Sequence, residues 1–417
     1  MHDGHSRCRI AGAVLCAFLG LTIRVPAQNW EIQPGDRIAI IGNAFADNMR
    51  RYGYLETLLR SRYPEYNLTV RNMGWSGDTL TLQPRPLNFG TTERHLRKER
   101  IDVVVLCFGM VESFDGVQAA ERFEAELRRY VLRFKAAKFN GKTAPRIVLV
   151  SPIYHEQLGP PLPDAAEHNR SIARYSAVME KVARELGVKF VDLLTPSKEL
   201  NERKPPVHLT ENGIHPGQLG YWYLCQIIAD AMTGGSAPVE IDVDVREKKA
   251  RVRGVQVEAV TGGRGTVEIR VQARRLMVPP PPSQGAVPLP RPFLERLPQI
   301  RIRGLERGRY ALQVGDRSIA VAEAGEWARG VRLTSLPAQE QAERLRHAVV
   351  EKNEYWFYRW RPHNTEYIFG RRRRPFGIVS FPPEMAAWDR LIAEKERELE
   401  QLSQPLPPAR FRIVRLP

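Results

Sequence analysis

Cysteine is scarce in this sequence, with four residues among 417. Cys8 and Cys16 lie in the N-terminal leader described below, whereas Cys107 and Cys225 lie in an apolar strand-like run and a helix-like run. Neither of the last two has metal-ligand spacing, and we expect two buried thiols in place of a disulfide framework. The scarcity excludes a small scaffold stabilised by many disulfides.

Long hydrophobic runs are absent after the first 27 residues. Arg7 and Arg9 precede an apolar run over residues 10–23, and small residues precede Gln28, as in a secretory signal peptide. The alternative is a membrane anchor, but the run is shorter than the roughly 20 residues that span a bilayer. We therefore expect residues 1–27 to be a signal peptide, and the mature chain to be secreted or periplasmic without a transmembrane anchor.

Negative charge is in short supply, because 63 Lys and Arg residues face 47 Asp and Glu residues, a net charge of +16. Most of the excess lies after Met232. A composition of 43% hydrophobic and 26% charged residues is that of a folded protein and excludes a wholly disordered or fibrous chain. The basic balance predicts an anionic partner, such as an anionic polysaccharide or a cell surface, and export argues against nucleic acid.

The length predicts more than one domain. From residue 36 to residue 232, short runs rich in β-branched residues alternate with stretches of helical period, which is typical of an α/β domain with a parallel sheet. We place this domain at residues 28–235. Its predicted strands are 37–41, 68–71, 102–107, 146–150 and 189–192.

The pattern changes after Gly234 and Gly235, where β-forming runs follow one another without segments of helical period. We interpret residues 236–336 as a small β-sandwich-like module. A proline-rich loop over residues 278–292 interrupts it. Its predicted strands are 239–245, 250–255, 266–271, 309–314 and 318–322.

Residues 337–417 form a C-terminal segment that is predicted to be helical to about Lys352 and again over 384–402. Between these helices, residues 355–364 mix aromatic side chains with arginines. This mixture favours a segment that docks its aromatics on the main domain, and the alternative is a surface that stacks on sugars or bases. We expect Arg371–Arg374 to be a solvated loop.

Four loops follow predicted strands, at the edge where open α/β sheets bind ligands. They are Gly42-Asn-Ala-Phe45, Asn72-Met-Gly-Trp-Ser-Gly-Asp-Thr79, Gly109-Met-Val-Glu-Ser-Phe114 and Glu211-Asn-Gly-Ile-His215. In order and spacing they resemble the motifs of the SGNH/GDSL hydrolase superfamily over about residues 34–232. The resemblance implies a flavodoxin-like fold that acts without a cofactor on esters or acylated carbohydrates. The whole arrangement is also similar to exported GDSL-type proteins of planctomycete-like proteomes.

The match to the family motifs is partial. Gly77 stands at the glycine that donates to the oxyanion, His215 at the base, and Asn43 at the aspartate of the first block. The positions of the nucleophilic serine, the oxyanion asparagine and the triad aspartate hold, in that order, Ala44, Val111 and Asn212.

These replacements remove groups that serine hydrolysis needs. Ala44 has no hydroxyl to attack a carbonyl. Val111 cannot donate to an oxyanion, a loss of about 2.7–4 kcal/mol of transition-state stabilisation, and Asn212 cannot stabilise an imidazolium as an anion does. Two hypotheses stay open: a hydrolase in which His215 activates water, and a non-catalytic carbohydrate- or surface-binding protein.

Other side chains near these motifs are weaker replacements. Glu211 would supply the missing carboxylate to His215, although an exposed loop acid is the more ordinary interpretation, and Glu112 would act as a general base for water. Ser76 and Ser113 fit turn residues better than nucleophiles.

A histidine and a glutamate, His155 and Glu156, follow the fourth predicted strand and would form a polar cluster with His215. Their spacing does not fit a zinc protease, and we expect no metal. We expect His168 to be a loop residue without a special role.

Overall fold

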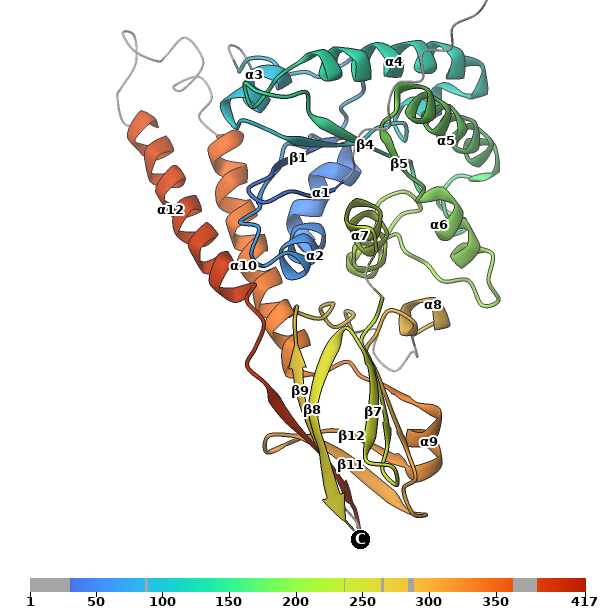
Figure 1. Ribbon diagram of the computed structural model, residues 1–417. Coiled ribbons are helices and arrows are strands. Elements are labelled where there is room, and N and C mark those ends of the chain that lie inside the picture. The colour runs from blue at the N-terminus through green and yellow to red at the C-terminus, as the bar shows by residue number, and fades with distance from the viewer. Residues whose placement is uncertain (1–30, 87–88, 236, 264–265, 284–288, 363–380) are drawn as a thin grey trace, which may run out of the picture.

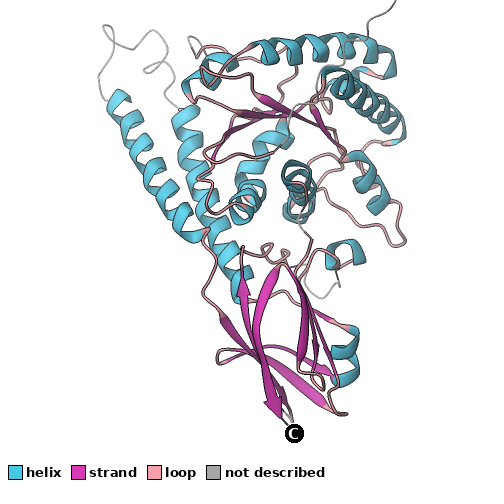
Figure 2. Ribbon diagram, in the orientation of Figure 1, coloured by secondary structure: helices cyan, strands magenta, loops and turns pink. Residues whose placement is uncertain are grey.

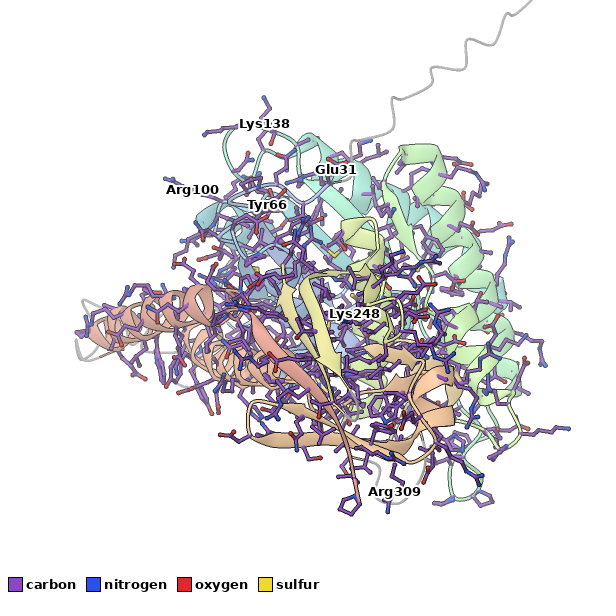
Figure 3. All side chains as sticks on the ribbon, turned by 60° about the horizontal axis from the view of Figure 1, so that its bottom comes forward. Glu31, Tyr66, Arg100, Lys138, Lys248 and Arg309 are labelled. Atoms are coloured by element: carbon purple, nitrogen blue, oxygen red, sulfur yellow. The ribbon has the colours of Figure 1, made fainter. Side chains whose placement is uncertain are left out.

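The computed structural model describes residues 31–86, 89–235, 237–263, 266–283, 289–362 and 381–417. It has three parts, an α/β domain, a β module and two long helices beside both (Figure 1; Figure 2). Figure 3, turned so that the β module comes forward, shows the two helices extending to one side. The predicted signal peptide and Arg371–Arg374 lie outside the described residues.

The α/β domain contains a parallel sheet of five strands in the order β2-β1-β3-β4-β5. This order is that of flavodoxin-like folds, so the predicted fold class is confirmed. Each strand agrees with the sequence prediction to within one residue at either end. The strands are β1 (Arg37–Gly42), β2 (Thr69–Asn72), β3 (Val103–Cys107), β4 (Arg146–Val150) and β5 (Lys189–Val191).

Helices cover both faces of this sheet, which is why its strands are apolar on both sides. Ile38 and Ile40 of β1 point to one core, and Ala39 and Ile41 point to the other. On the first face lie α1 (Ala44–Tyr52), α2 (Tyr54–Arg62), α6 (Leu194–Asn201) and α7 (Gln218–Thr233). On the second face lie α3 (Thr92–Lys98), α4 (Ala120–Ala136) and α5 (Ala166–Leu186).

The β module is a sandwich of two sheets around a shared apolar core. One sheet has the order β13-β10-β6-β7, and the other has the order β12-β11-β14-β9-β8. Its strands before residue 337 are β6 (Glu240–Asp244), β7 (Lys249–Arg253), β8 (Val255–Gly263), β9 (Thr266–Ala273), β10 (Gln299–Arg303), β11 (Arg309–Val314), β12 (Arg317–Glu323) and β13 (Val331–Arg332). The sequence interpretation missed β8, β10 and β13, and it also missed two short helices, α8 (Arg291–Leu294) and α9 (Ala324–Arg329).

The last strand of the chain, β14 (Ala409–Arg415), lies in the middle of the second sheet. It pairs antiparallel with β11 on one side and β9 on the other. Phe411 and Ile413 point into the sandwich core while Arg410 and Arg412 alternate with them. The C-terminal segment thus completes the β module, a role that sequence reasoning did not assign to it.

Between β13 and β14 the chain forms two antiparallel helices, α10 (Pro337–Trp360) and α12 (Phe381–Leu402) (Figure 1). The first helix does not stop near Lys352 as expected, because the aromatic stretch continues it. Trp356 and Trp360, one helical turn apart, are buried in the core of the α/β domain. The aromatic segment therefore docks on the domain.

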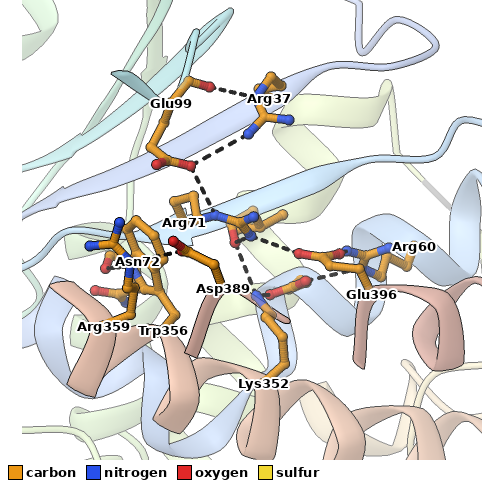
Figure 4. Close-up of polar contacts among 12 residues, drawn as sticks. Arg37, Arg60, Arg71, Asn72, Glu99, Lys352, Trp356, Arg359, Asp389 and Glu396 are labelled. Atoms are coloured by element: carbon orange, nitrogen blue, oxygen red, sulfur yellow. Dashed lines mark hydrogen bonds and ion pairs between the residues drawn. The ribbon is translucent and has the colours of Figure 1, made fainter. Parts of the chain in front are cut away.

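Two side chains of α10 cover the exposed edge of the parallel sheet. The ammonium of Lys352 donates to the carbonyl of Val70 at 3.0 Å, and the indole of Trp356 donates to the carbonyl of Asn72 at 2.8 Å (Figure 4). Residues four apart in a helix advance about 6 Å, which matches the rise of about 6.6 Å over two strand residues. The helix thus satisfies polar groups that an open edge strand leaves exposed.

Lys352 is fully buried and belongs to a network of charges between the helices and the domain (Figure 4). Its ammonium lies 2.6 Å from Glu56 Oε2, and Arg60 holds the other oxygen of Glu56 at 3.0 Å. Glu396 of α12 accepts from Arg60 and, at 2.6 Å, from Arg71. Burial alone would raise the pKa of Glu396, but Arg60, Lys352 and Arg71 lower it to about 2.

Two further predictions concern the cysteines and membrane-spanning segments. Cys107 and Cys225 are both buried and unpaired. Within the described ranges, every helix is too short or too polar to cross a membrane.

Replacing Lys352 with alanine should lower the free energy of unfolding by about 3 kcal/mol, because it leaves buried acceptors without their donor. Urea denaturation followed by tryptophan fluorescence measures the change. Lys395→Ala is the matched control, since this lysine pairs with Glu351 and Glu398 near the surface and should contribute less than about 1 kcal/mol. Equal losses in the two variants would contradict the role given to Lys352.

Candidate functional site

Three of the four motif loops, the first, third and last, meet the segment after β4 around a small cavity at the carboxyl ends of β1, β3 and β4. Its volume is about 60 Å³. It lies where the strand order reverses between β1 and β3, the usual ligand position in such sheets. Its walls are mostly apolar, and its lining residues are Asn43, Ala44, Phe45, Cys107, Phe108, Met110, Val111, Phe114, Val150, Ser151, Pro152, Ile153, Ile214 and His215.

The first loop brings Ala44 to the cavity wall. Gly42 allows β1 to run close to β3, because a Cβ there would lie 2.2 Å from the carbonyl oxygen of Cys107. The side chain of Asn43 accepts from the backbone N–H of Phe45 at 3.2 Å and caps α1. Ala44 is the first residue of that helix, so the position of the nucleophile carries only a methyl group.

The second loop packs on the same helix. A Cβ on Gly74 would lie 2.4 Å from the backbone nitrogen of Asp47, so only glycine fits this approach. Ser76 donates its hydroxyl to Asp47 at 2.8 Å, as expected of a turn residue. Gly77 has a φ of +86° and does not line the cavity described above.

The third loop supplies Val111 to the cavity and uses Glu112 for support. The two carboxylate oxygens of Glu112 accept from the backbone N–H groups of Leu80 at 3.0 Å and Gly109 at 2.8 Å. Burial raises the pKa of Glu112, and these two donors lower it. The carboxylate ties the second loop to the third, which gives no support to its predicted role as a base for water.

The last loop places Asn212 against His215. The Oδ1 of Asn212 accepts from the backbone N–H groups of Ile214 at 3.4 Å and His215 at 3.0 Å. Its Nδ2 therefore faces the ring and lies 2.9 Å from Nδ1 of His215. Because an amide NH₂ only donates, Nδ1 is the acceptor and the proton of the neutral ring is on Nε2. A triad histidine needs the opposite arrangement, with an unprotonated Nε2 as the base.

Glu211 does not orient this ring. It is exposed, and its backbone N–H donates to the carbonyl of His215 at 2.9 Å. Its carboxylate accepts from the hydroxyl of Tyr52, whose pKa is raised by burial and by this charge. The predicted replacement of the missing aspartate by Glu211 thus has no support in the geometry.

His155 and Glu156 support the backbone of the last loop and do not form the predicted polar cluster with the His215 ring. Glu156 is buried and accepts from the backbone N–H groups of Leu209 at 2.6 Å and Thr210 at 3.1 Å. A Cβ on Gly213 would lie 2.9 Å from Nε2 of His155, so the loop lies flat on that ring. Throughout the described ranges there is no group of three or more His, Cys, Asp or Glu side chains that could hold a metal ion.

A hydrogen-bonded chain of Ser113, His168 and His155 links the third motif loop to the loop after β4. The Ser113 hydroxyl lies 2.8 Å from Nε2 of His168, and Nδ1 of His168 lies 2.9 Å from Nδ1 of His155. Ser113 also donates to the carbonyl of Met110 at 2.8 Å and is fully buried, so it is a support and not a nucleophile. The expectation that His168 has no special role is wrong, because α5 carries its ring between the two loops.

The chain matches the model of the GDSL-like lipase/acylhydrolase family over residues 35–223. An acetylxylan esterase of Geobacillus stearothermophilus is 26% identical over 209 residues, which are 46% of this chain and 88% of that protein.

Solved structures extend the comparison to the whole chain. A gut microbial diltiazem-metabolizing enzyme covers 94% of this chain and is itself covered completely, with a TM-score of 0.71 and 18% identity. The two proteins therefore share the fold of the α/β domain, the helices and the β module. A catalytic mutant of the Geobacillus stearothermophilus acetylxylan esterase covers 49% of this chain, with a TM-score of 0.37 and 21% identity.

The neutral His215 ring should carry its proton on Nε2. Nitrogen NMR of the imidazole distinguishes the two tautomers directly. Asn212→Asp should move the proton to Nδ1, because a carboxylate only accepts, and Asn212→Ala should leave a mixture. A wild-type ring protonated on Nδ1 would overturn the assignment.

Acid should destabilise the fold through His168. Burial and the neighbouring His155 lower the pKa of His168 to about 4, whereas an unfolded histidine titrates near 6.5. The unfolded state therefore takes up the proton first, and stability falls as the pH drops from about 6.5 through about 4. Urea midpoints over this range should fall less steeply in His168→Gln than in the wild type. His347→Gln, at an exposed histidine of α10, is the control and should keep the wild-type slope.

Proposed function

Because residues 35–223 form a domain of the GDSL-like lipase/acylhydrolase family, we propose that this domain binds an acylated carbohydrate in the family cleft without cleaving it by the serine route. One observation carries the proposal. The amide of Asn212 donates to Nδ1 of His215, in a cleft where Ala44 occupies the nucleophile position. The nucleophile position thus lacks a hydroxyl, and His215 lacks a free Nε2 to act as the base. The one serine that lines the cavity among the described residues, Ser151, uses its hydroxyl in bonds to the backbone of Pro152, Leu193 and Leu194.

The size and the lining of the cavity support an acyl ligand. A cavity needs roughly 10–15 Å³ to hold one water molecule. A cavity of about 60 Å³ accordingly has room for a group the size of acetyl. Phe108, Val111 and Ile153 give it an apolar wall suited to a methyl group.

The carbohydrate part of the proposal comes from the relative. An acetylxylan esterase aligns in sequence with this α/β domain. The signal-peptide pattern of residues 1–27 supports an exported protein, secreted or periplasmic, which would meet such polysaccharides outside the cytoplasm.

The hydrolytic alternative requires His215 to take a proton from water. A protonated Nε2 cannot accept a proton from water. Both carboxylate oxygens of Glu112 already accept hydrogen bonds from backbone N–H groups. We therefore favour binding over turnover.

Binding should depend on the acyl group. Isothermal titration of the full chain with acetylated xylotriose should give an affinity at least tenfold higher than titration with the deacetylated sugar. Ala44→Leu should abolish the difference because the larger side chain fills the cavity. Ala125→Leu, at an exposed position of α4, is the matched control. Equal affinities for the two sugars would contradict the proposal.

Hydrolysis of a short-chain aryl acetate should be absent in the wild type and should appear when the missing groups return. We expect Ala44→Ser alone to be slow, and the variant that adds Val111→Asn and Asn212→Asp to be at least 100-fold faster, because an oxyanion donor alone contributes a factor of about 10²–10³. Wild-type turnover that is lost in His215→Ala would overturn binding without cleavage.

A further inference from the structure

A second and larger cavity lies where the α/β domain meets the β module. Its volume is about 540 Å³, within the range of ligand sites. Helices α2 and α7 contribute to one side, and the strands and loops of the module contribute to the other. It shares no lining residue with the cleft.

The described lining residues of this cavity include five arginines and no acidic residue. The arginines come from separate parts of the chain: the end of α2, β7, the turn after β9 and the loop after α8. They are Arg62, Arg253, Arg274, Arg275 and Arg296.

Carboxylates outside the lining neutralise only part of this charge. Asp230 pairs with both Arg62, at 2.6 Å, and Arg296. Glu240 pairs with Arg253. Five arginines against two carboxylates leave three positive charges.

The uncompensated charge is concentrated at Arg274 and Arg275. Both are exposed, and neither forms an ion pair with a carboxylate of the described chain. The Arg275 guanidinium lies over the ring of Tyr63, 5.5 Å from its centroid, which holds this side chain in place. Burial, the largest cause, lowers the pKa of Arg62, and the neighbouring Asp230 offsets part of this effect.

A buried hydroxyl in the same cavity also has no partner. Ser61 lines the cavity and is 2% exposed, and its Oγ forms no hydrogen bond with any described residue. An unsatisfied buried hydroxyl costs about 1–3 kcal/mol. The Oγ is closed to solvent in this conformation, and a rotation of the side chain about χ1 toward the cavity would let a ligand oxygen satisfy it, which is a second indication of a site.

We infer that this cavity binds a carboxylate-bearing oligosaccharide, such as a chain of uronic acid residues. A guanidinium matches a carboxylate with two parallel hydrogen bonds, and arginines spread over several elements suit charges spread along a chain. Leu276, Met277 and Val278 offer apolar surface for the faces of sugar rings. No aromatic side chain stands among the described lining residues, so recognition depends on charge and not on stacking.

The inference is independent of the acyl-binding cleft, and its test has its own probes. We would titrate the full chain calorimetrically with trigalacturonate, with neutral xylotriose and with inorganic phosphate. We expect trigalacturonate to bind at least tenfold more tightly than either of the others, and its affinity to fall as salt rises. Binding of phosphate as tight as that of trigalacturonate would show a simple anion site and overturn the inference.

Variants locate the binding. Arg274→Gln with Arg275→Gln should weaken trigalacturonate at least tenfold and change the urea midpoint only slightly, because neither residue has a carboxylate partner and Arg275 loses only its contact with the Tyr63 ring. Arg329→Gln with Arg412→Gln removes the same charge from exposed positions outside the cavity and should leave the affinity unchanged.

Ser61→Ala provides a second test at a position where the fold loses no hydrogen bond. It should weaken trigalacturonate severalfold and leave the affinity for acetylated xylotriose at the cleft unaltered. Wild-type affinity for trigalacturonate in both the double arginine variant and Ser61→Ala would place the ligand elsewhere and refute the inference.

Discussion

The organisation of this protein depends on how α10 closes the open edge of β2. A buried ammonium and an indole N–H reach two carbonyl groups of the edge strand, and a network of opposite charges surrounds the ammonium. The chain leaves the β module to make these contacts and returns through α12 to place β14 between β11 and β9. The strand that follows α12 therefore completes the module. The cavity of five arginines lies where α2 and α7 of the α/β domain meet this module.

Buried polar side chains support the loops of the cleft around Ala44. Glu112 joins the second loop to the third, Glu156 holds the backbone of the last loop, and the chain from Ser113 through His168 to His155 joins the third loop to the loop after β4. Buried polar groups of this kind are costly unless they are fully paired. Here they are paired, and they fix the shape of the loops around Ala44.

Much of the fold follows from local sequence patterns. The five strands of the parallel sheet are short apolar runs between helices, and parallel topology alone brings their carboxyl ends together. Local patterns do not predict elements whose partners are far away in the sequence. No local pattern predicts that β14 lies between β11 and β9. The aromatic stretch after Lys352 is helical because Trp356 and Trp360 pack in the domain core, which the local sequence does not reveal.

At the site, the replaced residues could be identified from the motifs alone. The tautomer of His215 was not, because it depends on backbone donors that hold Oδ1 of Asn212, and His168 was missed because its partners come from two other loops.

The three family positions that hold other residues in this cleft matter for catalysis more than for binding. Only interactions that strengthen in the transition state accelerate a reaction, whereas those made equally in the ground state only bind. The serine hydroxyl, the oxyanion amide and the aspartate act on charge that develops as a carbonyl is attacked, and these positions hold Ala44, Val111 and Asn212. The apolar wall and the loop supports act on the ligand before any bond changes. A methyl group gains more from Val111 than from an amide that would lie against it unpaired. In the proposed function, the residues at these three positions therefore leave, and at Val111 improve, the means of holding an acyl group.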